Sequence, residues 1–376
     1  MRKIAIGVCA LLLLAATGVG ALILALPAAR PRSDSPPAAA DAERAELVAA
    51  LRPPKRARPV IAVLAHNDGT ETTDFLVPYG VLHASNVADV SAVALRDGPV
   101  TLMPALRVRA QLDLAGFDAL HPDGADYVIV PALHRSDDPA LLTWLAAQAR
   151  SGAIVVGICD GAWVLGAAGL LDGRRATSHW FSVARLRKAF PSMTWAADRR
   201  YVFDRGVVTT TGVSASVPIS LTLVEAIAGR ERAQQLARDF GVPSFGAAHL
   251  SRAFALDREV VATAALNRLA FWSHDTLVVP LADGVDEVAL ALTADAYART
   301  FRTSVRSRAL GPEVVSRGGL HLIADSVGGG GDLAGEIRLP APGTSALDAA
   351  LAGVSARYGA RTADFAALQL EYDRPQ

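Results

Sequence analysis

The sequence predicts an α/β fold, a doubly wound parallel sheet with flanking helices. Short apolar runs of strand length, at 60–64 and 127–130, alternate with segments such as 139–150 in which apolar residues recur at helical spacing. Alternating strands and helices are typical of β-α-β units, which build parallel sheets. Of the 376 residues, 51% are hydrophobic and 20% charged, so the chain has enough apolar material for two domains.

The first strand leads into the turn-forming residues Asn67, Asp68 and Gly69, and a helix is expected from about Asp74 through Leu82. The later expected elements of this domain are, in chain order, strands at 90–95, 100–103 and 127–130, a helix at 139–150, a hairpin at 201–210 and a long helix at 219–236. The sheet closes near residue 245, which places the domain at 59–245.

The N-terminus predicts a membrane segment. Arg2 and Lys3 precede an uncharged run at 4–29, which reaches the roughly 20 residues that a spanning helix needs. We therefore expect a membrane anchor at 1–29, with a cleaved signal segment as the alternative. A Pro-rich linker at 30–58, with one short helix, follows it.

The charges near this segment do not fix its orientation. Most of the nearby arginines follow it, which favours a cytoplasmic body, whereas its signal-like character favours export. We favour an extracytoplasmic body and leave the cytoplasmic side open.

Net charge and cysteine content exclude several function classes. The formal net charge is zero, so no overall field attracts nucleic acid. The two cysteines are Cys9, in the membrane segment, and Cys159. A disulfide framework and a cysteine-rich zinc site are therefore excluded from the soluble part, which leaves Cys159 as a lone thiol.

Cys159 stands in a strand–turn–helix pattern. The apolar residues 155–158 run into Cys159, and Gly161 and Ala162 then begin a small-residue helix. This order is typical of a nucleophile elbow, in which a sharp turn lifts the nucleophile above the sheet and places it near a helix N-terminus. The alternative is that Cys159 is a small buried hydrophobic residue.

The stretch 157–180 continues with Gly-Leu-Leu-Asp-Gly-Arg-Arg-Ala-Thr-Ser-His-Trp and resembles the ThiJ/PfpI superfamily. It is most similar to the sensor domains of AraC-type regulators and to isocyanide hydratases. The resemblance implies the flavodoxin-like, class I glutamine amidotransferase-like fold. It also implies a site built around Cys159.

The resemblance nominates an acidic partner for the thiol. Residues 69–74 resemble the family's Gly-x-Glu-x-x-Asp segment, in which an acid at the start of the first helix points toward the cysteine. This implies that Asp74 contacts Cys159 and that Glu71 is the second candidate. Either carboxylate could instead stabilise the helix N-terminus, and for Glu71 we prefer that interpretation.

Two further candidates flank the cysteine motif. Asp160 departs from the family pattern, and a carboxylate there opposes thiolate formation by like charge. His179, beside Trp180, is expected to support the pocket without forming a standard triad.

Backbone donors are needed for a developing oxyanion. The elbow places the Asp160 N–H for this purpose, and the Ala132 N–H is the expected second donor. The segment Thr211, Gly212 and Val213 also resembles a family segment and is expected to line the pocket. No residue spacing suggests a metal or another cofactor, so we predict neither.

The last third repeats the opening pattern. Residues 276–287 align with 60–72, and a helical pattern at 288–301 corresponds to 74–87. Ala289 stands where Asp74 stands in the first copy. We expect 246–376 to form a helical connector and a smaller degenerate α/β domain without catalytic residues, and its excess of acidic residues argues against DNA binding.

Two functions follow from these residues. The first is a membrane-tethered protein whose Cys159 acts on, or senses, a small electrophile, with hydratase, glyoxalase or amidohydrolase-type chemistry implied by the resemblance. The second is a non-enzymatic ligand- or redox-sensing protein derived from the regulators' sensor domain. Both need a small-molecule partner, and a homo-oligomer is possible.

Overall fold

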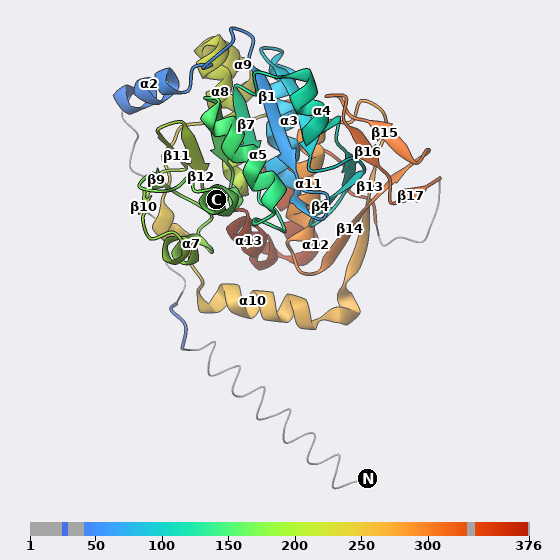
Figure 1. Cartoon of the computed structure of the whole chain (residues 1–376). Coiled ribbons are helices and arrows are strands. Elements are labelled where there is room, and N and C mark those ends of the chain that lie inside the picture. The colour runs from blue at the N-terminus through green and yellow to red at the C-terminus, as the bar shows by residue number, and fades with distance from the viewer. Residues whose placement is uncertain (1–24, 29–40, 329–334, 375–376) are drawn as a thin grey trace, which may run out of the picture.

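The computed structural model describes residues 25–28, 41–328 and 335–374, and its centre is a seven-stranded sheet (Figure 1). The strands lie in the order β11 (Tyr201–Asp204), β12 (Val207–Thr210), β8 (Ile154–Gly157), β7 (Tyr127–Val130), β1 (Val60–Ala65), β3 (Asp89–Ala94) and β6 (Leu112–Asp113). Only β11 is antiparallel to its neighbour, because a tight hairpin joins it to β12. The sheet is therefore mixed: it is parallel as expected except for this hairpin, which confirms the hairpin expected at 201–210.

Helices cover both faces of the sheet, and each face has its own apolar core. One core contains residues of α3 (Thr72–Ser85), α8 (Ser216–Ala228) and α9 (Arg230–Asp239). The other contains residues of α4 (Leu114–Leu120), α5 (Pro139–Arg150), α6 (Gly161–Ala167) and α7 (Val183–Ala189). The long helix expected at 219–236 is two helices, because Gly229 ends α8 with a φ of +87° that other residues rarely adopt.

A second unit follows in the chain. It contains β13 (Asp275–Pro280), α11 (Glu287–Ala298), β14 (Thr303–Ala309), β15 (Glu313–Val315), β16 (His321–Ile323), β17 (Ser326–Val327), α12 (Ala346–Tyr358) and α13 (Ala360–Gln369). Strands β13 and β14 are parallel and flank α11, as β1 and β3 flank α3, and each element begins 214 or 215 residues after its counterpart. Gly359, with φ +88°, separates α12 from α13 as Gly229 separates α8 from α9.

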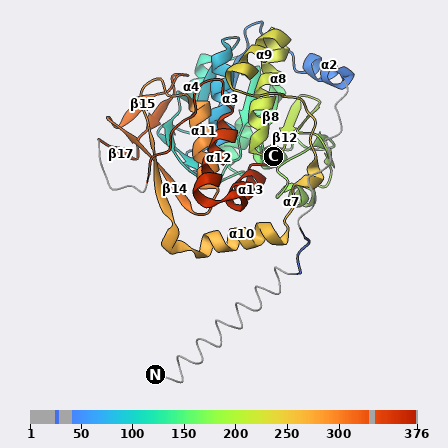
Figure 2. The ribbon, with the colours of Figure 1, turned by 180° about the vertical axis from the view of Figure 1, so that it is seen from behind.

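The two units pack through equivalent surfaces. Helices α3 and α11 lie side by side (Figures 1 and 2), and β5 (Arg107–Arg109) pairs antiparallel with β16. This pairing joins a hairpin of each unit into a five-stranded sheet that also contains β4 (Pro99–Met103) and β2 (Thr70–Glu71). The arrangement is that of a dimer contained within one chain.

Closely packed helices need small residues at their crossing point. A Cβ on Gly80 of α3 would lie 2.6 Å from a methyl carbon of Val288 on α11, so only glycine fits there. The counterpart of this contact joins Thr73 and Asp295, whose side chains form a hydrogen bond of 3.1 Å.

The remaining elements lie at the edges of the body. Helix α2 (Asp41–Ala50), inside the predicted linker, is tied to α8 by an ion pair of Arg44 and Glu225. The short strands β9 (Arg175–Ala176) and β10 (Thr194–Trp195) pair with each other, and α10 (Arg258–Leu269) connects the two units.

The predicted membrane helix falls mainly on residues 1–24, outside the described part of the chain. Within residues 25–28, 41–328 and 335–374, no helix has both the length and the apolar character that crossing a bilayer requires.

Candidate functional site

Cys159 lies in a sharp turn between a buried strand and a helix. Strand β8 ends at Gly157, and α6 begins at Gly161. Cys159 has a φ of +54°, in the left-handed region that non-glycine residues seldom adopt. A Cβ on Gly161 would collide with the carbonyl of Val130, so the helix can approach the neighbouring strand only with glycine at this position. The backbone geometry is that of a nucleophile elbow.

The elbow is held by hydroxyl groups on both sides. The Cys159 N–H donates to Thr210 Oγ1 at 3.1 Å, and Ser178 Oγ donates to the Cys159 carbonyl at 3.1 Å. The cysteine is 6% exposed, so its thiol is almost shielded from water.

Two acids of α3 lie beside the elbow. Glu71 caps the helix, and its Oε2 accepts the Asp74 N–H at 2.6 Å. Asp74 is completely buried, and its Oδ2 accepts the Ala132 N–H at 3.1 Å. The other oxygen of Asp74, Oδ1, has no hydrogen-bond partner within the described residues. Glu71 therefore has the capping role that we preferred for it, while Asp74 keeps one oxygen available.

The second unit adds a cationic and an acidic residue to this site, and the sequence did not suggest either. Arg299, at the end of α11, donates to Glu71 Oε1 and to Asp295 Oδ1, each at 2.8 Å. Asp295 is completely buried and lies opposite the start of α3. A buried guanidinium between two carboxylates compensates their charge and fixes their positions.

Burial and crowded negative charge dominate the electrostatics of this cluster. Burial raises the pKa of Asp74 well above its ordinary value, against the opposing influence of the Ala132 N–H and Arg299. Burial, followed by the charges of Asp295 and Asp74, also raises the pKa of Glu71 well above its ordinary value. One arginine therefore faces more carboxyl groups than it can neutralise, and the pKa values of Glu71 and Asp74 stay raised despite it.

The thiol shares this environment. Burial raises the pKa of Cys159 well above that of an ordinary thiol, and the charges of Asp74, Asp160 and Glu71 raise it further, while Arg299 lowers it. The expected activation by the helix N-terminus does not offset these effects. Cys159 is thus a protonated thiol at rest.

The half-buried Asp160 is held in place by two serines. Its Oδ1 accepts hydrogen bonds from Ser178 Oγ, at 3.0 Å, and from Ser182 Oγ. The Asp160 N–H makes no hydrogen bond to any described residue, so it is free to face an oxyanion. The expected second donor is not free, because the Ala132 N–H is already bonded to Asp74. The prediction that the Ala132 N–H is a second oxyanion donor is therefore wrong.

The other predicted pocket residues form a second cluster, around the C-terminal end of α13. His179 Nε2 is 2.9 Å from the Gln369 carbonyl, and Trp180 Nε1 donates to the Leu368 carbonyl at 2.8 Å. His179 and Trp180 therefore bind the end of the second unit, and His179 makes no hydrogen bond to the cysteine cluster.

Glu371 is the centre of this second cluster and was not predicted. Its Oε2 accepts the N–H groups of Gly212 at 2.6 Å and Trp180 at 3.1 Å, and its Oε1 is 2.9 Å from His249 Nε2. Buried Thr211 and Val213 flank Gly212. Gly212 thus holds the second unit's carboxylate, and no contact ties it to the thiol.

The described residues contain no group of three His, Cys, Asp or Glu side chains arranged to hold a metal ion. The cluster's carboxyl groups are instead bonded to Arg299 and to backbone N–H groups.

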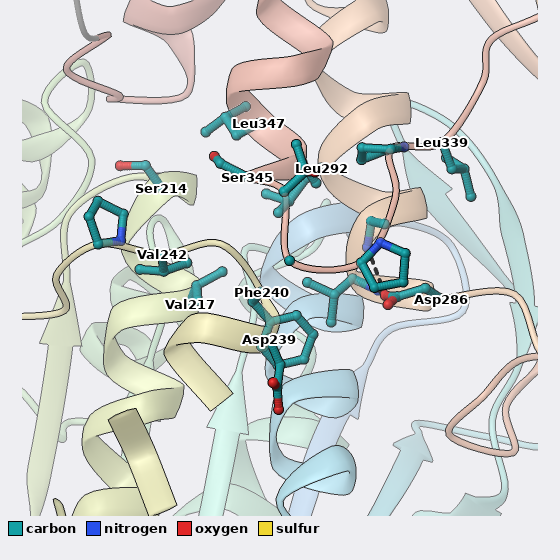
Figure 3. Close-up of a pocket in the computed structure, with 18 of the residues that line it drawn as sticks. Ser214, Val217, Asp239, Phe240, Val242, Asp286, Leu292, Leu339, Ser345 and Leu347 are labelled. Carbon is teal, nitrogen blue, oxygen red and sulfur yellow. Dashed lines mark hydrogen bonds between the residues drawn. The ribbon is translucent and has the colours of Figure 1, made fainter. Parts of the chain in front are cut away.

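A separate cavity of about 470 Å³ lies between the units (Figure 3). Most of its wall is apolar, with Val217 and Phe240 from the first unit and Leu292 and Leu347 from the second. Arg200 also lines it, and its guanidinium forms neither a hydrogen bond nor an ion pair with a described residue. Burial lowers the pKa of Arg200, against the charges of Tyr372, Asp373 and Glu371.

Comparison with known proteins identifies the first unit. The model of the DJ-1/PfpI family matches residues 60–226. The isonitrile hydratase of Pseudomonas putida is 30% identical over 166 residues, which cover 43% of this chain and 69% of that protein. The HTH-type transcriptional regulator CdhR of Pseudomonas aeruginosa is 35% identical over 106 residues, 28% of this chain and 31% of the regulator.

The chain thus covers less than a third of that regulator's length. Among solved structures, a DJ-1 superfamily protein from Salmonella typhimurium has a TM-score of 0.44 and 24% identity, covering 50% of this chain and all of that one. The family match spans the central sheet, the acids of α3 and the elbow. Because the family model matches residues 60–226 and the chain covers more than two thirds of a relative that is 30% identical to it, the chain belongs to the DJ-1/PfpI family.

Proposed function

We propose that the chain catalyses the hydration of a small electrophile, with Cys159 as the nucleophile and Asp74 as its proton-transfer partner. The observation that carries this proposal is the pairing of an elbow cysteine with a buried carboxyl group that has one oxygen free. An isonitrile is the first substrate class to test, because a relative that matches the chain over most of its own length is named isonitrile hydratase.

A thiol beside a carboxyl group whose pKa is raised suits this reaction. The Asp74 carboxyl gives its proton to the terminal isonitrile carbon while the Cys159 sulfur bonds to the same carbon, and the thiol proton passes to Asp74. The product is a thioimidate. Water then adds to that carbon, the carbon–sulfur bond breaks and the sulfur regains a proton. Isonitrile and water become a formamide, and no oxidant or reductant is needed.

The test is turnover of n-butyl isocyanide, followed as N-butylformamide by proton NMR, with methylglyoxal and a peptide in parallel. We expect wild-type turnover to fall at least about 1,000-fold in Cys159→Ser, since the nucleophile is lost. Asp74→Asn removes the proton donor and leaves the side-chain volume almost unchanged. Asp97→Asn, on an exposed turn, is the matched control and should keep wild-type activity.

Absence of wild-type turnover on all three compounds, or equal rates for wild type and Cys159→Ser, would overturn the enzymatic proposal. The second candidate is a ligand-sensing protein without turnover, and the cavity between the units is the observation that favours it. Arg200 is half-buried and has no ion-pair partner among the described residues, so a bound anion would give its guanidinium a partner that is partly shielded from water. A small organic anion with an apolar body would supply that partner and fill the apolar wall.

Not every charge at this cavity favours an anion. Asp286 is neutralised by Arg317 at 2.9 Å, while Asp239 and Asp373 are exposed. The sensing proposal therefore places the ligand's anionic group at Arg200, with its apolar body against Val217 and Leu347.

Binding of hexanoate to the full chain, measured by calorimetry with hexanol as the uncharged control, tests this second candidate. Arg200→Gln should weaken the binding of hexanoate about tenfold and leave the binding of hexanol unchanged, because only the charge-assisted contact is lost. Arg306→Gln, on an exposed arginine, is the matched control. Equal affinities of wild type and Arg200→Gln for hexanoate would contradict it.

We also propose that residues 4–29 tether the chain to a membrane, with an extracytoplasmic body and no nucleic-acid partner. The uncharged run after Arg2 and Lys3 supports the tether, and the acidic balance of 246–376 argues against DNA. Alkaline extraction of membranes from cells expressing the full chain, together with protease accessibility of the body, tests location and side.

A further inference from the structure

Four large apolar side chains are exposed within seven residues of each other on α10 and the turn after it. Leu266 and Leu269 of α10 are each 68% exposed, and Phe271 and Trp272 of the 3₁₀ turn Phe271–Ser273 are 74% and 77% exposed. Isolated exposed apolar residues are common, but large neighbouring ones mark a surface that meets another apolar phase. We call these four residues the α10 patch.

The patch is held in place from its other side. Asn267, the buried residue of α10, donates to the Thr300 carbonyl at 2.9 Å and to Thr362 Oγ1 at 3.2 Å. His274 Nε2 lies 2.8 Å from the Asn267 carbonyl and closes the following turn. Because Asn267 faces the second unit, its neighbours Leu266 and Leu269 point outward at helical spacing.

The aromatic pair extends the same surface. The rings of Phe271 and Trp272 pack edge to face, with centroids 5.2 Å apart at 77°. Tryptophan favours the membrane–water boundary, where its ring meets acyl chains and its N–H meets headgroups. Charged residues beside the patch are Arg258, Glu259 and Arg268, all exposed.

The N-terminal segment reaches the body at this helix. The Arg258 N–H, at the start of α10, donates to the carbonyl of Pro27 at 3.0 Å. Pro27 lies at the end of the uncharged run 4–29. Both views show α10 along one edge of the body (Figures 1 and 2). Pro27 and the α10 patch therefore lie at opposite ends of the same helix.

We propose that the α10 patch lies in the headgroup region of the bilayer and fixes how the body sits on the membrane. This inference rests on the proposed tether. Short aromatic and leucine-rich surfaces beside basic side chains insert to this depth, and Pro27, at the end of the uncharged run, contacts the same helix. The patch then supports both the orientation of the body and its attachment.

The experiment uses the full chain in liposomes of phosphatidylcholine and phosphatidylglycerol, with and without brominated lipid, which quenches tryptophans that touch acyl chains. Liposome flotation first measures attachment. We expect brominated lipid to quench wild-type fluorescence and Trp272→Phe to remove most of that quenching. Trp195→Phe, which alters a half-buried tryptophan of the first unit, is the matched control. Brominated lipid should quench its fluorescence as much as it quenches that of wild type.

A second variant tests the surface without touching the reporter. Leu266→Glu/Phe271→Glu places two charges on exposed positions, so it should fold normally and lower the quenching of Trp272 at least twofold. Flotation without quenching of Trp272 would overturn the α10 proposal and leave the tether standing. Failure to float would overturn both. A detergent-solubilised dimer that the double variant dissociates would assign the patch to self-association and also overturn the membrane proposal.

Discussion

The two β-α-β units have the same scaffold but opposite roles at their interface. In the first, Glu71 caps α3 and Asp74 follows in the first turn; in the second, Asp286 caps α11 and Ala289 takes the place of Asp74. At the other end of the helices the difference is reversed. Asp295 and Arg299 of the second unit reach the first unit's acids, whereas their counterparts, Gly80 and Ala84, carry no functional group.

The comparison shows what makes one unit a site and the other its support. Both have the parallel strands, the helix and the hairpin, but only the first has the segment with β7, β8 and the elbow. The second unit passes from β17 to α12 without it. A β-α-β unit supplies acids, the elbow supplies the nucleophile, and a neighbouring unit compensates the buried charge.

Removing that compensation should have the largest effect on stability. Arg299→Met leaves Glu71 and Asp295 buried without their cation, which we expect to destabilise the fold by about 3–5 kcal/mol. Urea unfolding followed by circular dichroism measures this. Arg306→Met, on an exposed arginine of β14, should change stability by less than about 0.5 kcal/mol. Similar values for the two variants would mean that the second unit does not support the acids.

The helix crossing offers a smaller change. Gly80→Ala forces a methyl group against Val288 and should destabilise the fold by about 1–3 kcal/mol. Adding Val288→Ala makes room and should recover part of the loss. Gly246→Ala is the matched control, because nothing lies within 4 Å of its added Cβ. No difference between Gly80→Ala and Gly246→Ala in urea midpoint would argue against close packing of α3 on α11.

The raised carboxyl pKa values predict how stability depends on pH. A carboxyl group whose pKa is higher in the folded state makes its full contribution to the free energy of unfolding at pH values below its unfolded pKa of about 4. This contribution is lost as the pH rises through the folded pKa. Wild type should therefore lose up to about 1.4 kcal/mol per pH unit for each proton released. Asp74→Asn should show a shallower decline. Parallel pH profiles of urea midpoint for the two proteins would contradict the raised pKa of Asp74.

The smallest effect is expected from restoring an acid in the second unit. Ala289→Asp in the Cys159→Ser background should give no turnover of n-butyl isocyanide, because this unit has no elbow. The same change in the wild-type background should leave turnover unchanged. It should weaken the binding of hexanoate severalfold, because Ala289 lines the cavity and an added carboxylate there repels the anion. Turnover by the variant without Cys159 would show that the acid, and not the elbow, defines the site.

The fold and the first half of the site could be predicted from local sequence. Apolar runs indicated the strands, and the residues after β8 indicated the elbow, because both signals lie within a few adjacent residues. The internal repeat was also visible as matched patterns. The break at Gly229 was missed, since a positive φ leaves a weaker signal.

The contribution of the second unit could not be predicted. Arg299 is 228 residues from Glu71 and Glu371 is 159 residues from Gly212, so spacing along the chain gives no sign of these contacts between the units. Family resemblance drew attention to His179 and Gly212, which here hold the C-terminal end of the second unit. The repeat itself was the one available clue, because a degenerate copy that still packs on its partner can supply residues to it.

The titration of Cys159 tests the central claim most directly. Iodoacetamide modification of wild type between pH 6 and 11, followed by mass spectrometry, should give a thiol pKa above the ordinary value of about 8.5. Asp74→Asn should lower it, because the charge of Asp74 raises the pKa of Cys159. Asp97→Asn should leave it unchanged. An ordinary pKa that Asp74→Asn does not alter would contradict a cysteine and carboxyl group acting as one coupled site.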